Sequence, residues 1–371
     1  MSITARPSTR CADIFVRHLT TTPRTAAERT RLMQAPAFGT VFTDHMVQID
    51  WTVDAGWTGH RVVARAPVQL DPAAAVLHYG QEIFEGLKAF RHADGSVWTF
   101  RPQANAERFR ASARRMAMPE LPVADFLGSL ETLVAADAEW VPGADEASLY
   151  LRPFMFGSEA FLGVRSAREM TYLLIASPVG PYFASGVQPV SIWVAQDYHR
   201  AGPGGTGAAK CSGNYAASLL SQQHAYAQGC EQVCFLDAKT NTNLEELGGM
   251  NVFVIHSDGS VSTPRLTGSI LEGVTRSSVI RLLRDAGHEV SERDIALAEV
   301  LAGLEGGSIG EVFACGTAAV VTPVGRLAGA EFDLTVADGD AGKITMDVRE
   351  QLMDIQYGRA RDRYGWMRRI V

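Results

Sequence analysis

Short apolar runs and alternating apolar and polar positions recur along the chain, and both patterns predict β-strands. Residues 89–100 predict a hairpin, because an Asp94-Gly95 pair stands between two alternating segments. Five further segments predict single strands: 148–157, 170–179, 190–198, 231–236 and 250–255. Another, 311–324, joins an apolar strand to a turn of small residues.

Apolar residues at helical spacing predict four helices between these strands: 104–117, 123–140, 214–228 and 275–287. Pro102 precedes the first helix, and Gly229 and Gly287 are the expected stops of the last two. Strands and helices are interspersed in both halves of the chain. This order predicts an α/β (or α+β) fold.

Residues 170–196 contain no charged side chain, which makes them the one segment to test as a membrane helix. A membrane helix needs about 20 mostly apolar residues, whereas Pro178, Pro181 and Pro189 interrupt this segment. It therefore predicts strand, linker and strand in a soluble chain. We expect an N-terminal domain at 1–179, a linker at 180–189 and a C-terminal domain at 190–371.

Composition narrows the class of protein further. Of the 371 residues, 46% are apolar and 20% charged, which is typical of globular domains. A net charge of −7 disfavours a nucleic-acid partner. The five cysteines form no CxxC pair, and the first residues lack the apolar run of a secretory signal. A reducing, cytoplasmic location is therefore expected.

Lysine is scarce, since only four of the 34 basic residues are lysine: Lys88, Lys210, Lys239 and Lys343. Lys210 ends a loop of small residues that begins at Gly202. One hypothesis is a phosphate cradle for a nucleotide, but the loop lacks the GxxxxGK[ST] pattern and no apolar strand leads directly into its glycines. The other is a lysine nucleophile on a mobile loop. On the loop alone, a solvated surface lysine is the more common situation.

Several sequence blocks favour a functional Lys210 over a solvated surface lysine. They are His78–Arg91, Tyr150–Pro153, Lys210–Ala216, Glu245–Phe253, Leu271–Arg276 and Cys315–Ala319. In these blocks and their order, nearly the whole chain resembles the class IV (fold-type IV) pyridoxal-phosphate aminotransferases, and within them the branched-chain amino acid aminotransferases. The resemblance implies a smaller N-terminal α/β domain, a larger C-terminal domain, pyridoxal 5'-phosphate between them, and a homodimer.

The resemblance also assigns the cofactor site. Lys210 would be the Schiff-base and proton-transfer residue, and Glu246 would pair with the pyridine nitrogen, which makes the ring an electron sink. Glu246 is chosen over Glu245 because its five-residue step to Asn251 fits the family pattern. The remaining expected cofactor contacts are Arg108, Val274, Thr275 and Thr317 to the phosphate and Tyr215 to the phenolic oxygen.

The expected substrate contacts are Tyr79, Phe84, Tyr150, Arg152, Gly249, Thr317 and Ala318. Arg152 would place a carboxylate, because an arginine on an apolar strand needs such a partner. Gly249 stands where vertebrate members carry threonine, which leaves backbone amides to bind the carboxylate there. No metal site is predicted.

The resemblance implies a ping-pong reaction in which L-leucine, L-isoleucine or L-valine gives its amino group to 2-oxoglutarate, yielding a branched 2-oxo acid and L-glutamate. Two rivals share the fold: D-amino acid transamination and aminodeoxychorismate lyase chemistry. Their lysine and glutamate would be the same, so these two residues do not discriminate. A third, remote alternative is a non-catalytic nucleotide-binding module.

Overall fold

The computed structural model describes residues 11–34, 37–180 and 186–371. These residues form two compact units, one of residues up to Gly180 together with Trp366–Val371, the other of residues 181–365. Residues 1–10, where part of the secretory-signal prediction falls, lie outside the described residues. So do residues 181–185 of the predicted linker.

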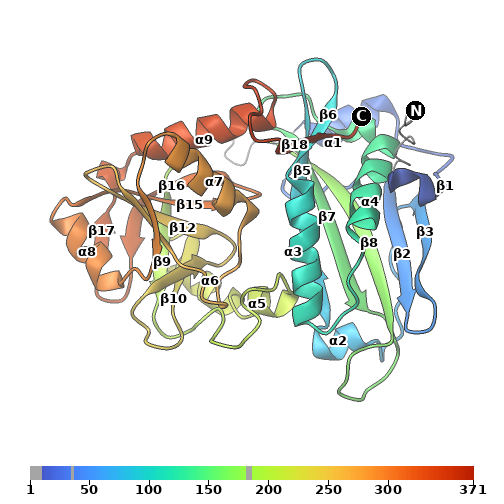
Figure 1. Ribbon diagram of the computed structural model, residues 1–371, viewed down its shortest axis with the longest axis horizontal. Coiled ribbons are helices and arrows are strands. Elements are labelled where there is room, and N and C mark those ends of the chain that lie inside the picture. Colours follow the sequence, from blue (N-terminus) through green and yellow to red (C-terminus); the bar gives the residue numbers. More distant parts are fainter. Residues whose placement is uncertain (1–10, 35–36, 181–185) are drawn as a thin grey trace, which may run out of the picture. The chain divides into compact units, whose positions relative to one another are not determined.

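The first unit is built on a nine-stranded mixed sheet (Figure 1). Its strand order is β1 (Val16–His18), β3 (Gly56–Ala64), β2 (His45–Thr52), β8 (Glu169–Val179), β7 (Ser148–Gly157), β5 (Leu87–Arg91), β6 (Val97–Phe100) and β18 (Met367–Arg369), while β4 (Glu82–Phe84) pairs with β7. The predicted hairpin is confirmed, since β5 and β6 are antiparallel and Gly95 has a φ of 85°.

Two helices of the first unit, α3 (Pro102–Arg115) and α4 (Val123–Ala136), pack on one another and cover one face of this sheet (Figure 1). Phe109 of α3 lies with its ring 5.6 Å from Phe126 of α4 and 5.8 Å from Tyr172 of β8. The buried Tyr172 hydroxyl is paired with Ser129 at 2.8 Å. The short helices are η1 (Cys11–Ile14), α1 (Ala26–Met33), α2 (Ala75–Tyr79) and η2 (Ala138–Trp140).

The predicted domain of residues 190–371 extends too far at its end. β18 pairs antiparallel with β6, with Met367 opposite Phe100, and Arg101 N donates to the Trp366 carbonyl at 2.7 Å. Because these backbone bonds complete the first sheet, Trp366–Val371 belong to the first unit. The two units are nearly equal in length, as are the predicted ranges 1–179 and 190–371, and do not show the smaller and larger domains that the resemblance implies.

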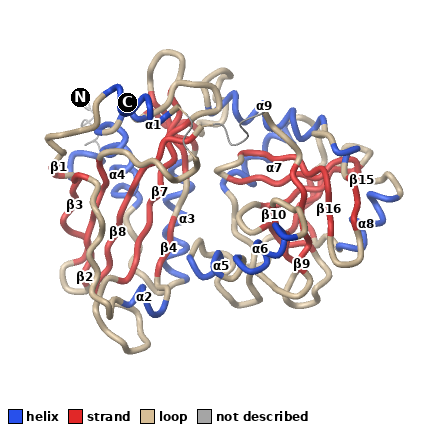
Figure 2. The backbone as a smooth tube through the Cα atoms, turned by 180° about the vertical axis from the view of Figure 1, so that it is seen from behind, coloured by secondary structure: helices blue, strands red, loops and turns tan. Residues whose placement is uncertain are grey.

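The second unit is built on another nine-stranded sheet, whose strands are drawn in red in Figure 2. Its order is β11 (Leu244–Leu247), β10 (Gln232–Leu236), β9 (Val190–Ala195), β16 (Val320–Ala328), β15 (Ile309–Gly316), β12 (Asn251–His256), β13 (Val261–Pro264) and β14 (Val290–Arg293), with β17 (Asp333–Thr335) on β16. Because β11 also pairs with β12, six strands close into a ring. Alternate residues, such as Ile192 and Val194 or Val252 and Val254, enter one buried cluster.

The helices of the second unit are α5 (Ser212–Ala216), α6 (Leu219–Ala227), α7 (Val274–Asp285), α8 (Leu297–Glu305), η3 (Ala337–Gly339) and α9 (Lys343–Gln356). The single helix predicted over 214–228 is wrong, because α5 and α6 are separate. The amide and the hydroxyl of Ser218 both donate to the Tyr215 carbonyl, at 3.0 and 2.7 Å. These bonds compete for the carbonyl with the regular hydrogen bonds of a continuous helix.

Other sequence predictions hold. Gly229 and Gly287, the expected stops, have φ of 70° and 93°. The interspersed strands and helices confirm the α/β (α+β) class. Within the described residues, each helix is too short or too polar to cross a bilayer.

Candidate functional site

Lys210 ends a loop that is packed tightly against residues 268–271. A Cβ at Gly207 would lie 2.1 Å from the Ser269 carbonyl oxygen, so only glycine permits this approach. The amide of Ala208 donates to the Gly268 carbonyl at 3.1 Å. The Asn214 side chain donates to the carbonyls of Thr206 and Ala209, both at 2.8 Å. These contacts fix the conformation of the loop that ends at Lys210.

The Lys210 amine is half-buried and donates to the Tyr215 hydroxyl at 2.5 Å. The environments of the other lysines differ. Lys239 is exposed, and Lys343 is an exposed residue whose amine lies 2.5 Å from Asp347. Lys88 is buried on β5 of the first unit. Lys210 is therefore the lysine whose surroundings best suit amine chemistry.

Glu246 is a buried carboxylate, 2% exposed, near the end of β11. Its Oε1 lies 2.7 Å from Nη1 of Arg200 and accepts the Leu271 amide at 2.8 Å. Burial raises the pKa of Glu246 to about 7, against the lowering effects of Arg200, the Leu271 amide and the charge of Lys210. A carboxylate in this state can bind a further cationic N–H group.

The strand separates Glu246 from its neighbour Glu245, because successive side chains on a strand point to opposite faces. Glu245 accepts a hydrogen bond from the Ser269 hydroxyl, and burial raises its pKa as well. Lys210 acts on the pKa of Glu246 and is not among the main charges acting on Glu245. The geometry thus favours Glu246 as the carboxylate that accompanies the lysine.

The N-terminus of α7 is tied to the same strands. Asn251, paired with Glu246 across β11 and β12, donates from Nδ2 to the Leu271 carbonyl at 3.1 Å. A Cβ at Gly273, the N-cap, would lie 2.1 Å from Asn251 Oδ1, so any larger residue there would displace the Asn251 side chain. Val274 and Thr275 stand in the first turn that follows this glycine. Backbone N–H groups at such a helix start favour an anion.

Two turns complete this group. A Cβ at Gly249 would lie 3.8 Å from the Tyr215 ring, and one at Gly316 would lie 3.4 Å from the Gly249 carbonyl oxygen. Thr317 and Ala318 follow directly in the turn from β15 to β16. Close approaches therefore connect Lys210, Tyr215 and Gly249 with the turn that carries Thr317 and Ala318. Asn251 connects Glu246 with the segment that leads to Val274 and Thr275.

In the first unit, Arg108 of α3 forms a bidentate pair with Glu85, from Nε at 2.7 Å and Nη2 at 2.8 Å. Glu85 is fully buried and also accepts from Asn105 Nδ2 at 2.8 Å. The neighbouring Arg110 instead pairs with Glu120 in a more exposed position. This difference favours Arg108 over Arg110 as a functional arginine.

An aromatic cluster in the same unit holds Arg152. Its guanidinium lies 4.8 Å from the Phe84 ring centre and 5.3 Å from that of Tyr150, and Nη2 donates to the Tyr150 hydroxyl at 2.9 Å. Arg152 Nε is buried without a hydrogen-bond partner. An additional acceptor, such as a carboxylate, would satisfy it.

Tyr79 contacts a different part of the first unit. It is 40% exposed, its hydroxyl donates to the Leu162 carbonyl, and its ring lies 6.4 Å from Phe161. The sequence prediction placed it with Phe84 and Tyr150 in one apolar pocket, but its contacts are with the 161–162 segment.

Sequence reasoning did not assign roles to Arg200 and Glu85. Arg200 stands just before the glycine-rich loop, and its burial cannot be predicted from composition. Glu85 is a lone acid inside an apolar block, which is a usable signal because buried acids need partners. No cluster of three or more His, Cys, Asp or Glu within the described ranges is placed to hold a metal.

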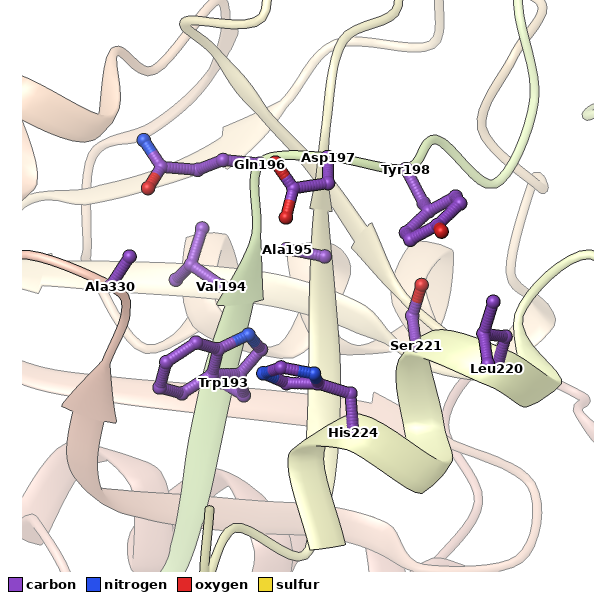
Figure 3. Close-up of a pocket in the computed structure, with 10 residues that line it drawn as sticks. All are labelled: Trp193, Val194, Ala195, Gln196, Asp197, Tyr198, Leu220, Ser221, His224 and Ala330. Atoms are coloured by element: carbon purple, nitrogen blue, oxygen red, sulfur yellow. The ribbon is translucent and has the colours of Figure 1, made fainter. Parts of the chain in front are cut away.

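A separate pocket of about 370 Å³ opens at the end of β9 (Figure 3). It is lined by Trp193, Tyr198, Leu220, Ser221 and His224 among others, and the side chains of Asp197 and Ser221 point into it. None of the predicted site residues lines this pocket.

Comparison with known proteins decides the family. Residues 82–327 match the family model described as amino-transferase class IV. The chain belongs to the class IV aminotransferases. A relative in this family, the branched-chain-amino-acid aminotransferase of Mycolicibacterium smegmatis, is 53% identical over 354 residues, covering 94% of this chain and 96% of the relative.

Two solved structures agree with the fold. The Escherichia coli branched-chain amino acid aminotransferase has a TM-score of 0.73 at 26% identity, covering 88% of this chain and 100% of that one. The Thermobaculum terrenum branched-chain amino acid aminotransferase, solved in its PLP-form, has a TM-score of 0.71 at 23% identity, covering 88% and 98%. The fold-type IV architecture predicted from the sequence is confirmed.

Proposed function

We propose that this class IV aminotransferase transfers the amino group of L-leucine, L-isoleucine or L-valine to 2-oxoglutarate, giving the branched 2-oxo acid and L-glutamate by a ping-pong mechanism. It is a pyridoxal 5'-phosphate enzyme of the branched-chain-amino-acid aminotransferase type, supported by 53% identity to a relative of that name. The main structural support is the half-buried Lys210, whose amine donates to the Tyr215 hydroxyl and whose charge acts on the buried Glu246.

The donor set of the second unit fits the cofactor. Pyridoxal phosphate carries an aldehyde, a pyridine nitrogen and a phosphate, and it supplies an electron sink for the substrate α-carbon. The Lys210 amine suits the aldehyde, and the buried Glu246, whose pKa is about 7, suits the pyridine N–H. The start of α7 at Val274 and Thr275 suits the phosphate, because the N–H groups of a helix N-terminus favour an anion.

Each of these residues has its own role in the proposed reaction. Lys210 Nζ removes the proton from the substrate α-carbon, and Tyr215 orients that amine through its 2.5 Å hydrogen bond. Glu246 holds the proton at the pyridine nitrogen, because a carboxylate kept from water interacts strongly with a cationic N–H. Thr317 adds a hydroxyl to the phosphate contacts. In the first unit Arg108, oriented by Glu85, supplies a planar fork for the phosphate.

The aromatic cluster of the first unit accounts for dual substrate use. The rings of Phe84 and Tyr150 offer apolar surface to a branched side chain, and Arg152, whose Nε lacks a partner, offers a donor to the second carboxylate of 2-oxoglutarate. Gly249, Thr317 and Ala318 offer backbone amides to the carboxylate that both substrates share.

We also propose a homodimer. In the segment after β7 that Tyr79 contacts, Leu162 is 66% exposed and Val164 is 90% exposed. Apolar side chains that gather on a surface in this way suit burial against a second copy. Light scattering of the purified protein would give twice the chain mass, and a monomer at micromolar concentration would contradict the proposal.

The proposed location is the cytoplasm, and the partners are small molecules without nucleic acid or membrane. Four of the five cysteines, Cys211, Cys230, Cys234 and Cys315, are free and buried. Burial raises the pKa of Cys234 and Cys315 to about 12, so these thiols are poor nucleophiles. Cell fractionation would test the location.

The deciding experiment compares amine donors with 2-oxoglutarate as acceptor. L-Leucine should be transaminated much faster than D-alanine; faster reaction with D-alanine would overturn the substrate proposal. Purified protein should also show visible absorbance, or gain it on adding pyridoxal phosphate. If it does neither, the result would contradict the proposal and support the alternative of a nucleotide-binding module.

A further inference from the structure

Arg200 is a buried arginine that joins three parts of the second unit. The whole residue is 4% exposed and its side chain 2%. Its Nη1 lies 2.7 Å from Glu246 Oε1, 3.1 Å from the Ser269 carbonyl oxygen and 3.4 Å from that of Gly207. The loop before Lys210, the 268–271 segment and β11 therefore meet at one guanidinium.

The pair between Arg200 and Glu246 favours the ionised form of the carboxylate. A buried carboxylate takes up a proton unless a positive group compensates the lost hydration. The titratable groups acting most strongly on Glu246 are Arg200 and Lys210, which favour the ionised form, and Glu245, which opposes it. Arg200 is the larger of the two positive influences.

The same guanidinium also fixes the lysine loop. Gly207 is pressed against Ser269 closely enough to exclude a side chain, and Arg200 donates to the carbonyls of both residues. Lys210 follows Gly207 within one short turn of the same loop. A displacement of Arg200 would thus move the loop that carries the lysine together with the carboxylate that accompanies it.

We propose that Arg200 is a positioning residue that keeps Glu246 ionised and aimed, and that locks the Lys210 loop in register with it. The inference rests on the proposed function, in which Glu246 meets the pyridine N–H. Arg200 acts through Glu246 and through backbone carbonyls. A neutral side chain of similar length would leave a buried carboxyl group that takes up a proton and is held by the Leu271 amide.

The test compares Arg200→Gln and Arg200→Lys with Arg265→Gln. Arg265 is a matched control, because it follows β13 near the same loop but forms an exposed pair with Asp294. Infrared spectra of the cofactor-free proteins at about pH 8 report a protonated buried carboxyl, which is assigned to Glu246 by its loss in an added Glu246→Gln variant. Pyridoxal phosphate affinity is measured by absorbance titration.

Arg200→Gln should show the protonated-carboxyl band where the wild type and Arg265→Gln do not, and its pyridoxal phosphate affinity should fall roughly tenfold or more. Arg200→Lys keeps a charge without the planar fork, so its band and affinity should be intermediate. If Arg200→Gln does not fold, Arg200→Lys against wild type decides.

Arg200 variants that match Arg265→Gln in both the band and the affinity would overturn the proposal. A loss of affinity without the band would overturn it too, since that result indicates a purely structural role. The proposed function and the role of Arg200 can fail separately. Wild-type protein that neither binds pyridoxal phosphate nor uses leucine refutes the proposed function, while the infrared band still tests the Arg200–Glu246 pair.

Discussion

The amine of Lys210 and the hydroxyl of Tyr215 are joined by a 2.5 Å hydrogen bond across one turn of chain. The bond is possible because α5 begins at Ser212, which brings the phenol back over the end of the loop. The lysine is therefore held in a defined orientation by a group that is itself on a helix. A side chain held in this way should be sensitive to substitution.

Lys210→Ala should reduce leucine transamination by roughly 10²–10⁴-fold or more, because the variant lacks the group that moves the α-proton. The fold should persist, as the side chain is only half-buried. Steady-state rates and far-ultraviolet circular dichroism check both statements, with Lys343→Ala as the exposed control. Borohydride reduction of the holoenzyme should tag Lys210 on peptide mapping; a tag on Lys88, Lys239 or Lys343 would refute the assignment.

Glu246→Gln should change how stability depends on pH. The pKa of Glu246 is raised from 4.5 to about 7 in the folded chain, so the folded state binds more protons than the unfolded state between these values. The stabilisation is complete below about pH 4.5 and is lost as the pH rises through about 7. The free energy of unfolding should thus decline with rising pH, with a slope approaching about 1.4 kcal/mol per pH unit from this group.

Urea unfolding of the cofactor-free protein between about pH 5 and 8 measures this decline. Glu246→Gln should flatten it, whereas Glu305→Gln at the exposed end of α8 should not. Equal pH profiles for the wild type and Glu246→Gln would show that the carboxyl titrates normally.

Arg108→Ala should destabilise the cofactor-free protein by about 3–5 kcal/mol, because it leaves the fully buried Glu85 without its bidentate partner. It should also weaken pyridoxal phosphate binding. Arg110→Ala, on the same helix but in a more exposed ion pair, should lose at most about 1 kcal/mol. Urea unfolding and cofactor titration of both variants check the contrast, and similar losses in the two would argue against a special role for Arg108.

Gly86→Ala should disturb the aromatic cluster. A Cβ at Gly86 would lie 2.1 Å from the Tyr150 hydroxyl oxygen, so the ring must move, and with it the hydroxyl that Arg152 contacts. We expect an increase in KM for leucine and 2-oxoglutarate of roughly tenfold, from the loss of about one hydrogen bond and its packing. Gly143→Ala is the control, since its Cβ would meet only Arg91 at an ordinary 3.6 Å. Unchanged KM values in Gly86→Ala would show that Tyr150 does not line the substrate site.

Local elements were predictable where one physical signal dominated. The strand 148–157 coincides with β7, and the hairpin turns at Asp94-Gly95, because alternation and turn chemistry agree there. The break between α5 and α6 was not predictable, because it depends on the Ser218 hydroxyl bonding the Tyr215 carbonyl. The return of β18 to β6 was also hidden, since three residues of strand carry too little pattern to reveal a distant partner.

At the candidate site, the residues were predicted from the family resemblance, whereas their burial, partners and pKa shifts come from the structure. The sequence could not distinguish Glu245 from Glu246 on chemical grounds, whereas the strand places them on opposite faces with different partners. The roles of Arg200 and Glu85 were not predicted, because each depends on a buried ion pair with a residue far along the chain. Arg200 pairs with Glu246, and Glu85 pairs with Arg108.

The strand β18 imposes an order on folding during synthesis. Thr99 of β6 and Arg368 of β18 are hydrogen-bonded partners separated by 269 residues, and the whole second unit is made between them. While the ribosome produces that unit, one edge of β6 has no strand to pair with, and unpaired edges invite aggregation. The nascent first unit can therefore complete its sheet only after the chain of the second unit has been made.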